Sequence, residues 1–591
     1  MNYPVWYLPE IGGGLLIAII AVLHVFVSHF AVGGGLYLIY AEKKGLREGS
    51  EAILEFTRRH ARFFLLLTMV FGSITGVGIW FIIALVNPAA TSLLIHIFVF
   101  GWAAEWVFFV VEISAAFVYF YMFGRMDSAT HLKVGWVYFI SAWMSLFLIN
   151  GIIGFMLTPG SWLENQSFWS GFFNPSFWPS LLFRTCMAVM LAGVYGYLTA
   201  SFTRDQSVRV AMTRFSAKWS LLALAAAAPA AAWYVSILPD PARELVLGTS
   251  PTIVAAGQWG VAAVIVVVAL SLVFGFFKAT LNTRTTALAA MLGALVLLGS
   301  FEWIREAARR PYAINEVVYS NMIFKKDLPA LNDKGYLQTA LWVEERDIDP
   351  ENQLEGGREL FIQQCYACHT LNGFNNDLMA QTSHMSHKAL VSYIGKIHEV
   401  RYFMPPFAGT REETAMLASY IATGLHGKEP AAKASGTAAV DPGLELFESH
   451  CASCHAADDL GPATEDMTRD EIVDLLATLD ELSEEMEPFE GSDEETAALA
   501  AFLYFLSERD EEPPPPPLST AVDGAELFDS ECVACHAPED MADALQGWEP
   551  AEIREALDKL DEFSDEMVPF EGSPEEKDAL TNFLHTLGRE N

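Results

Sequence analysis

Cysteine is scarce in this chain, and the few cysteines leave nothing for disulfide bonds. The 591 residues contain 7 cysteines, and six of them stand in three copies of one short motif, C-x-x-C-H. The seventh, Cys186, lies alone inside an apolar stretch, where a thiol usually packs as a small hydrophobic group. A disulfide framework of the kind that holds small secreted domains is therefore excluded.

Strand patterns and an excess of basic charge are also missing. No stretch alternates apolar and polar residues over the length of a strand, so the sequence predicts an all-α fold. Asp and Glu outnumber Lys and Arg by 72 to 36, and a negative net charge excludes nucleic acid as a partner. A basic segment and a small-residue cleavage site are absent before the first apolar run, so we expect that run to stay as a membrane helix.

The three copies of C-x-x-C-H are the strongest motifs in the sequence. Their cysteines and histidines are Cys365, Cys368 and His369; Cys451, Cys454 and His455; and Cys532, Cys535 and His536. The motif is typical of c-type haem attachment, in which the thiols form thioether bonds and the histidine binds the iron. Zinc would need a second pair of ligands for each copy, and none is in register.

A methionine follows each motif at a similar distance. Met404, Met486 and Met567 lie 35, 31 and 31 residues after their histidines, each in the sequence Met-x-Pro-Phe. Methionine is the usual second axial ligand in small cytochromes c, so we expect three haem c groups with His/Met ligation. In the first unit three histidines are alternative ligands: His384, His387 and His398. With a Glu-Leu-Phe helix before the cysteines and an apolar helix at the end, the units resemble class I cytochromes c over about residues 350–591.

Eight apolar runs are long enough to cross a bilayer. They cover about residues 11–40, 63–87, 93–123, 134–158, 178–202, 215–238, 252–277 and 285–305. Lys and Arg gather in the loops after the odd-numbered runs, whereas the loops after the second, fourth and sixth runs carry only Arg243. By the positive-inside rule, the N-terminus and the chain after the eighth run face outward. We therefore expect a multi-pass protein of the bacterial inner (cell) membrane, with its N-terminus and haem c units on the periplasmic side.

The acidic charge is confined to the last part of the chain. Residues 431–591 hold 43 Asp and Glu against 7 Lys and Arg, whereas residues 1–430 are balanced. Such a surface could steer a basic soluble redox partner. The alternative is a solvating surface, suited to solubility or to a saline habitat, and the even spread of the charge favours it.

Several ionisable side chains lie inside the apolar runs, where charge is costly and commonly functional. They are His24, His29, His96, Glu105, Glu112, Arg184, Glu302, Arg305 and Glu306. A single histidine in an apolar helix could be a hydrogen-bonded core residue. Imidazoles and carboxylates spread over four helices favour at least one haem b in the bundle, and a membrane anchor without haem is the alternative.

Four of the runs carry a family resemblance. The first reads His24-Val-Phe-Val-Ser-His-Phe-Ala-Val-Gly33 and continues to Glu42, the third holds Glu105 and Glu112, and the fourth holds Asn150-Gly151. The eighth leads into Glu306-Ala-Ala-Arg309-Arg310-Pro311-Tyr312. Over about residues 10–312 these motifs resemble subunit I of the cytochrome bd quinol oxidases.

The resemblance implies roles for five of these residues. His24 and Glu306 would ligate haem b, which could be high-spin, as in the family. Arg309 would contact the haem propionates. Glu105 and Glu112 would lie on a proton path. Two departures concern quinol: Phe183-Arg184 stands near the place of a family histidine that ligates low-spin haem b, and the quinol-binding loop shrinks to about Pro239–Pro251.

The expected architecture is an eight-helix transmembrane bundle followed by three small all-α cytochrome c domains. The expected domains and linkers are 1–312 (bundle), 313–350 (linker), 351–427 (first cytochrome c unit), 428–440 (linker), 441–509 (second unit), 510–520 (proline-rich linker) and 521–591 (third unit). The predicted function is electron transfer between the three haem c groups and haem b within a respiratory chain. The alternatives are a bd-like terminal oxidase that reduces O₂ with electrons from the haem c units, and a quinol:cytochrome c oxidoreductase. Expected partners are membrane lipid, quinol, a basic soluble redox protein, and a second membrane subunit or larger respiratory complex.

Overall fold

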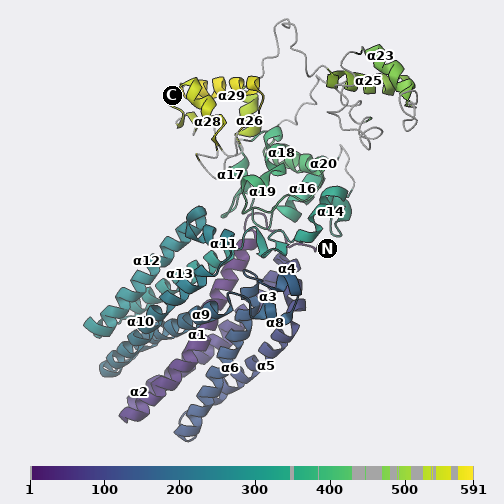
Figure 1. Cartoon of the computed structure of the whole chain (residues 1–591). Helices are drawn as coiled ribbons and strands as arrows, with labels where there is room; N and C mark the ends of the chain where they lie inside the picture. The colour runs from purple at the N-terminus through teal and green to yellow at the C-terminus, as the bar shows by residue number, and fades with distance from the viewer. Residues whose placement is uncertain are drawn as a thin grey trace. The chain divides into compact units, whose positions relative to one another are not determined.

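The computed structural model of the chain describes residues 3–346, 352–383 and 385–428 without interruption (Figure 1). Further along it describes residues 469–479, 491–507, 524–533, 541–542, 544–560 and 572–589, and the single residues Leu446, Met467, Phe489, His536, Phe563 and Phe570. Contacts divide the chain into two compact units: residues 1–385 and 389–426 belong to the first, and residues 427–560 and 569–591 belong to the second.

In the described part of the chain, eight helical spans are long and apolar enough to cross a membrane, which confirms the predicted number. The spans are α1 (Gly13–Glu48), α2–η1–α3 (Glu51–Leu66, Leu67–Gly72, Ser73–Val86), α5 (Val99–Tyr121), α6 (Ser128–Phe155), α9 (Phe177–Ser201), α10 (Gln206–Ser236), α12–η3 (Pro251–Leu272, Val273–Phe277) and α13 (Arg284–Ala307). Shorter helices connect them: α4 (Pro88–Ile97), α7 (Trp162–Asn165), α8 (Phe168–Phe172), α11 (Asp240–Glu244), η2 (Leu245–Thr249) and η4 (Ala279–Leu281).

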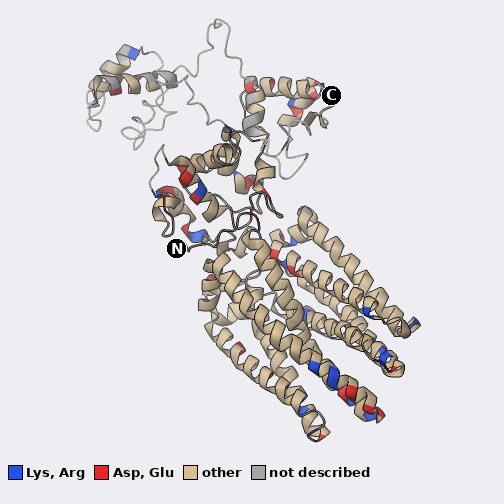
Figure 2. Cartoon of the chain, turned by 180° about the vertical axis from the view of Figure 1, so that it is seen from behind, with Lys and Arg blue, Asp and Glu red and all other residues tan. Residues whose placement is uncertain are grey.

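Charge and capping distinguish the two ends of the bundle. Figure 2 shows Lys and Arg gathered at the ends of the long helices. The four spans that start at this Lys- and Arg-rich end, α2, α6, α10 and α13, have N-cap side chains that accept backbone N–H bonds: Ser50, Asp127, Asp205 and Thr283. Each cap satisfies a donor that the first helical turn leaves unpaired. Polar caps and basic side chains therefore mark one end of the bundle.

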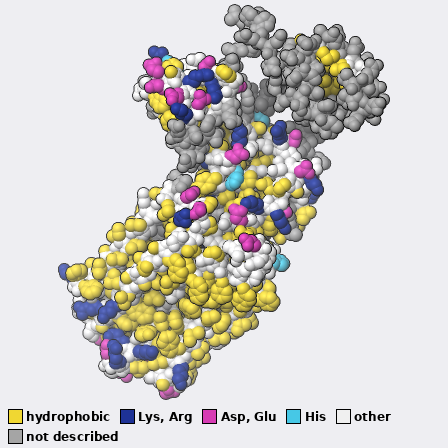
Figure 3. Space-filling view, viewed as in Figure 1, with side chains coloured by type: hydrophobic (Ala, Val, Ile, Leu, Met, Phe, Trp, Pro, Cys, Tyr) yellow, Lys and Arg dark blue, Asp and Glu magenta, His cyan; other side chains and the backbone are white. Residues whose placement is uncertain are grey.

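The flanks of the bundle are apolar. Figure 3 shows hydrophobic side chains over much of the visible surface of the spans. Val77, Trp106 and Val261 are exposed by 71%, 65% and 62%, which would be costly in water and is favourable against lipid. The chain is therefore a multi-pass membrane protein in contact with lipid.

Helix α9 lies at the centre of the bundle. It packs on α10 and, at one point, almost backbone to backbone on α1. A Cβ atom added at Gly33 of α1 would stand 1.9 Å from the carbonyl oxygen of Ala188 in α9. Small residues at such crossings let membrane helices approach closely.

In the part of the chain that the structure describes, the fold is helical apart from short β pairings that the sequence did not reveal. The structure also corrects the position of one histidine. The third apolar run is interrupted at Phe98, so His96 lies in the short helix α4, where it is exposed, and not in a membrane span. The described residues also include an antiparallel pair of strands, β1 (Tyr312–Ile314) and β2 (Val318–Tyr319). Strands of three and two residues are too short to leave a period-two pattern in the sequence.

The chain after α13 continues through short elements to the first cytochrome c unit. These elements are η5 (Lys325–Asp327), α14 (Leu328–Lys334) and α15 (Tyr336–Thr339). The unit itself contains α16 (Gln353–Gln364), α17 (Leu378–Thr382), α18 (His387–Gly395), α19 (Ile397–Val400), α20 (Arg411–Ser419) and η6 (Tyr420–Leu425). The carboxylate of Glu413 at the start of α20 accepts N–H bonds from Tyr336 and Leu337 at 2.8 and 2.7 Å, which ties the connecting segment to this unit.

The second compact unit is also helical where it is described. It contains α23 (Arg469–Ala477) and α25 (Asp493–Ser507), then α26 (Gly524–Glu531), α28 (Pro550–Leu557) and α29 (Pro574–Leu587). Ile472 and Leu476 of α23 pack with Leu499 of α25, and Phe528 of α26 packs with Phe583 of α29. Where the chain is described, α16 and α26 before the first and third motifs and the helices at the ends of the units agree with the predicted outline.

Candidate functional site

The first C-x-x-C-H motif forms a tight turn directly after α16. Cys365 and Cys368 are free thiols, and the backbone N–H of His369 donates to the carbonyl of Cys365 at 3.0 Å. The Nδ1 atom of His369 lies 3.3 Å from the carbonyl oxygen of Asn376, so Nδ1 carries the hydrogen and Nε2 keeps its lone pair. Burial lowers the pKa of His369, which favours the neutral, iron-binding form. These residues fit a covalently attached haem.

The predicted methionine ligand of this unit lies in a loop that hydrogen bonds hold in place. The backbone N–H of Met404 donates to the carbonyl of Arg401 at 2.7 Å, and the carbonyl of Met404 accepts a bond from Nδ1 of His398 at 2.6 Å. His398 therefore holds the loop through one ring nitrogen. His387 begins α18, and His384 lies outside the described residues. Met404 remains a predicted ligand.

The third motif repeats the backbone turn of the first. The N–H of Cys532 donates to the carbonyl of Phe528 at 2.9 Å, and the N–H of His536 donates to the carbonyl of Cys532 at 3.0 Å. The first motif has the same pair of bonds at 2.9 and 3.0 Å. The remaining predicted haem c residues lie outside the described part of the chain: Cys451, Cys454, His455, Met486, Cys535 and Met567.

The first cytochrome c unit binds the segment that leads into α1. Tyr366, inside the first motif, accepts a bond from the N–H of Leu8 at 2.7 Å and donates its hydroxyl hydrogen to the carbonyl of Trp6 at 3.0 Å. The N–H of Leu371 donates to the carbonyl of Pro9 at 2.9 Å. The haem c motif is thus tied by hydrogen bonds to the beginning of the bundle.

The loop of Met404 contacts further helices at this end of the bundle. Tyr402 and Phe403 pack against a small core of Leu245, Ile253 and Ala307, which come from η2, α12 and the last turn of α13. Ala307 directly follows Glu306, the predicted haem b ligand. The candidate haem c site and the candidate haem b residues therefore lie at one end of the bundle.

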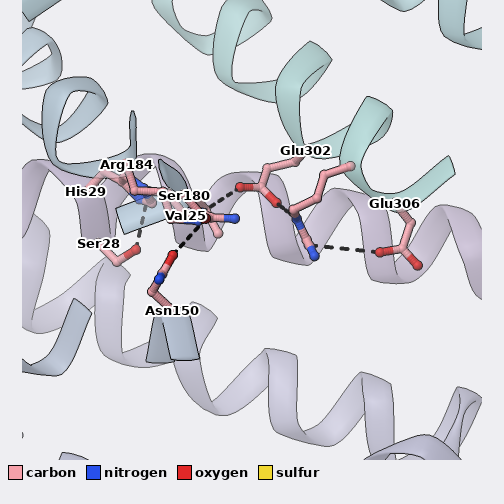
Figure 4. Close-up of polar contacts among 9 residues, drawn as sticks. Val25, Ser28, His29, Asn150, Ser180, Arg184, Glu302 and Glu306 are labelled. Carbon is pink, nitrogen blue, oxygen red and sulfur yellow. Dashed lines mark hydrogen bonds and ion pairs between the residues drawn. The ribbon is translucent and has the colours of Figure 1, made fainter. Parts of the chain in front are cut away.

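Five charged residues form a cluster at this end of α9 and α13: Arg184, Glu302, Arg305, Glu306 and Arg309. Figure 4 labels Arg184, Glu302 and Glu306 among them. Arg184 and Arg305 each bind a different oxygen of Glu302 at 2.9 Å. Glu306 pairs with Arg309 and lies 3.9 Å from Arg305. Three arginines against two glutamates leave a net positive charge.

The cluster has unused hydrogen-bond donors. Among the described residues, nitrogen atoms of Arg184, Arg305 and Arg309 are buried without a partner. A buried guanidinium N–H without an acceptor costs free energy, so an anionic group bound here would stabilise the cluster. The propionates of a haem have that chemistry, and the residues therefore fit the group that Arg309 was predicted to contact.

Two histidines of α1 offer nitrogen ligands near this region. Nδ1 of His24 lies 3.1 Å from the hydroxyl of Thr75 in α3. Nδ1 of His29 lies 2.9 Å from the carbonyl of Val25, and its Nε2 is buried without a partner in the described structure. A carbonyl only accepts, so Nδ1 of His29 carries the hydrogen and Nε2 has a free lone pair, as in an iron-binding histidine.

In the structure, the side chains of His24 and Glu306 contact different residues. His24 pairs with α3, whereas Glu306 is 56% exposed at its side chain and pairs with two arginines. Sequence reasoning named Arg184, Glu302 and His29 as intramembrane residues but did not pair them. The partners Arg184 and Glu302 are 118 residues apart, and no local pattern in the sequence links them.

The predicted proton-path residues lie on α5. Glu112 is buried, and one of its carboxylate oxygens lies 3.1 Å from the hydroxyl of Tyr138 in α6. Glu105 is partly exposed, two turns away along the same helix. Their roles remain predictions.

In comparisons with known proteins, both parts of the chain match a protein family. Residues 15–259 match the family model of cytochrome bd terminal oxidase subunit I. Residues 352–421, 438–503 and 519–584 each match that of cytochrome c oxidase, cbb3-type, subunit III. A cytochrome bd subunit I domain is followed by three cytochrome c domains. This confirms both resemblances seen in the sequence.

Comparisons with curated proteins and solved structures give little information beyond these two family matches. No curated protein matches the chain. Among solved structures, a bd oxidase from Geobacillus thermodenitrificans is similar, with 15% identity, a TM-score of 0.46 and coverage of 51% of this chain and 87% of its own. A likeness this weak carries no argument about function.

The two families confirm the general function predicted from the sequence. The protein is a membrane-bound multihaem redox protein of respiration, and it binds haem c and haem b. The use of quinol is a property of the bd oxidases as a family.

Proposed function

We propose that this cytochrome bd-like protein exchanges electrons between three haem c groups and at least one haem b in the bundle. The observation that carries the proposal is the contact of the first cytochrome c domain with the end of α13, through Tyr402 and Phe403 on Ala307. When bound, both haem types supply one-electron redox chemistry. Residues of this chain would hold the two sites close together, since Glu306 adjoins that contact.

Specific residues would hold the groups. His369 and Met404, His455 and Met486, and His536 and Met567 would bind the haem c irons, and the six motif cysteines would form the thioether bonds. His24 and Glu306 are the proposed haem b ligands, with Arg309 at the propionates. The buried, unpartnered Nε2 of His29 makes this residue a further candidate ligand.

The haem c domains would lie on the periplasmic side of a bacterial inner membrane. The Lys- and Arg-rich ends of the spans lie opposite the end that the first domain contacts, which supports this orientation. The acidic domains beyond residue 431 suit a basic soluble redox partner. Quinol and a second membrane subunit are further proposed partners.

The test follows electrons in both directions. In the absence of oxygen, oxidised holoprotein is mixed with a reduced, basic, soluble cytochrome c. In a second experiment, reduced holoprotein is mixed with the same soluble cytochrome c in its oxidised form. The absorption of haem c and of haem b is recorded in both. We expect haem b to change its redox state after haem c in at least one direction, with a rate independent of the concentration of the soluble protein. If the absorption of haem b changes in neither experiment, the proposal is refuted.

A bd-like oxidase is the second candidate, and Glu105 and Glu112 in α5 favour it because reduction of O₂ consumes protons. Carbon monoxide added to the reduced protein distinguishes the two. A shifted haem b spectrum indicates an open iron position and supports the oxidase. An unchanged spectrum indicates that both axial positions are filled and supports electron transfer alone.

A further inference from the structure

The segment that follows α13 turns back onto the first haem c motif. The N–H of Ser320 donates to the carbonyl of Pro311 at 2.8 Å. The hydroxyl oxygen of Ser320 in turn lies 3.8 Å from the Sγ atom of Cys368. One hydrogen bond and one side-chain contact therefore join Pro311, the residue after Arg310, to a haem-attachment cysteine.

The β1–β2 hairpin in this segment also reaches the loop of the predicted methionine ligand. The rings of Tyr312 and Tyr319 stack with their centroids 4.8 Å apart, and the ring of Tyr319 lies 6.5 Å from that of His398. His398 is the residue that donates to the carbonyl of Met404. The chain from the end of the bundle therefore lies against both the cysteine and the methionine parts of the first haem c site.

Arg310 brings a positive charge to this contact, and its side chain is partly buried. Arg305 and Arg309 each pair with Glu306, whereas no acidic side chain in the described part of the chain pairs with Arg310. Burial lowers the pKa of His369, and the positive charge of Arg310 lowers it further. A cation that no described carboxylate neutralises therefore acts on the predicted iron ligand.

The three cytochrome c units differ in charge. Residues 351–427 hold 7 Asp and Glu against 5 Lys and Arg, whereas residues 441–509 hold 20 against 2 and residues 521–591 hold 20 against 4. A haem iron gains a positive charge when it is oxidised, so nearby carboxylates stabilise the oxidised form and nearby cations stabilise the reduced form. Charge therefore favours the reduced haem most strongly in the first unit.

We infer that Arg310, at the end of the bundle, raises the reduction potential of the first haem c and makes it the highest of the three. This rests on the proposed function, in which His369 binds the iron of that haem. An electron shared among the haem c groups would then reside mainly on the one next to the bundle. Each such exchange oxidises one iron and reduces another by one electron, and no proton moves. Arg310 acts through its charge and not as a ligand.

The test is an anaerobic redox titration of the holoprotein in detergent, in which the absorption of haem c and of haem b is recorded against the solution potential. We expect Arg310→Gln to lower the highest of the three haem c potentials and to leave the other two unchanged. The electron equilibrium between this haem and the other two should change at least threefold, which is about 28 mV for one electron.

Two further variants separate charge from structure. Arg310→Lys keeps the positive charge and should keep most of the wild-type potential. Lys325→Gln removes a positive charge from the same segment, but Lys325 is 46% exposed and pairs with Glu316 at 2.5 Å, so water and its partner already screen it. This control should leave all three haem c potentials unchanged.

Four outcomes overturn the inference: no shift in any haem c potential, a shift confined to a haem c of lower potential, equal shifts in Arg310→Gln and Arg310→Lys, and a larger shift in haem b than in haem c. An unchanged ratio of haem c to haem b shows that each variant has folded, and Arg310→Met gives a second neutral variant if Arg310→Gln has not. The titration is an equilibrium measurement, so it reports the charge at haem c even if the kinetic test of the proposed function fails.

Discussion

Arg184 illustrates how much a single buried charge matters in this protein. Its side chain is 2% exposed inside one end of the bundle, and it forms an ion pair with Glu302. Glu302 in turn also binds Arg305. One carboxylate thus pairs with two cations.

Glu302→Gln should therefore destabilise the bundle by about 3–5 kcal/mol, because the buried Arg184 guanidinium loses its anion and Arg305 keeps only Glu306, at 3.9 Å. Thermal unfolding of the holoprotein in detergent, followed by loss of haem b absorption, measures the effect. Glu48→Gln breaks the exposed pair with Lys44 and should change stability by under about 1 kcal/mol. Equal effects of the two substitutions would contradict the assigned role of Glu302.

Glu413 has a similar role outside the membrane. Its buried carboxylate accepts backbone N–H bonds from Tyr336, Leu337 and Thr410. Glu413→Ala should destabilise the first cytochrome c domain by about 3 kcal/mol or more, since three N–H groups lose their acceptor. Denaturant unfolding read at the haem c band measures this, and exposed Glu412→Ala, which should be nearly neutral, is the control.

At the scale of helices, length and apolarity were enough to predict the eight spans. The break at Phe98 was not predictable, because the residues on both sides of it are equally apolar. The α1–α9 crossing was not predictable either, since it depends on which helices become neighbours. The same limit applies to the Glu42–His131 pair, whose members are 89 residues apart.

The α1–α9 crossing gives a prediction for helix packing. Gly33→Ala forces a methyl group against the backbone of Ala188 and should destabilise the bundle by about 1–3 kcal/mol or prevent its assembly. Gly257→Ala in α12 is the matched control, because a Cβ there meets no atom within 4 Å. Thermal unfolding in detergent should separate the two variants, and an equally stable Gly33→Ala protein would show that the helices do not pack this closely.

At the scale of the molecule, the first cytochrome c domain shares a compact unit with the bundle. Leu245 of the bundle is 2% exposed and packs near Tyr402 and Phe403, whereas Leu247, in the same short helix, is 71% exposed. Sequence motifs predicted the domain and its haem residues. They could not predict which bundle residues it contacts, because these come from separate helices.

Leu245→Asp should slow electron exchange between haem c and haem b at least tenfold, because a buried carboxylate would separate the domain from α13. Leu247→Asp should leave the rate unchanged. Rapid mixing with the soluble cytochrome c measures both, and haem content confirms that both variants are loaded. Equal rates in the two variants would mean that this contact does not carry electrons.

On these grounds we expect one chain to hold haem b in its membrane bundle and haem c in its three cytochrome c domains. Extraction of the purified protein with acidic acetone, followed by haemochrome spectra of the soluble and protein-bound fractions, tests this most directly. We predict at least one extractable haem b for every three haem c groups that stay bound. A preparation with only protein-bound haem c would contradict the presence of a haem site in the bundle.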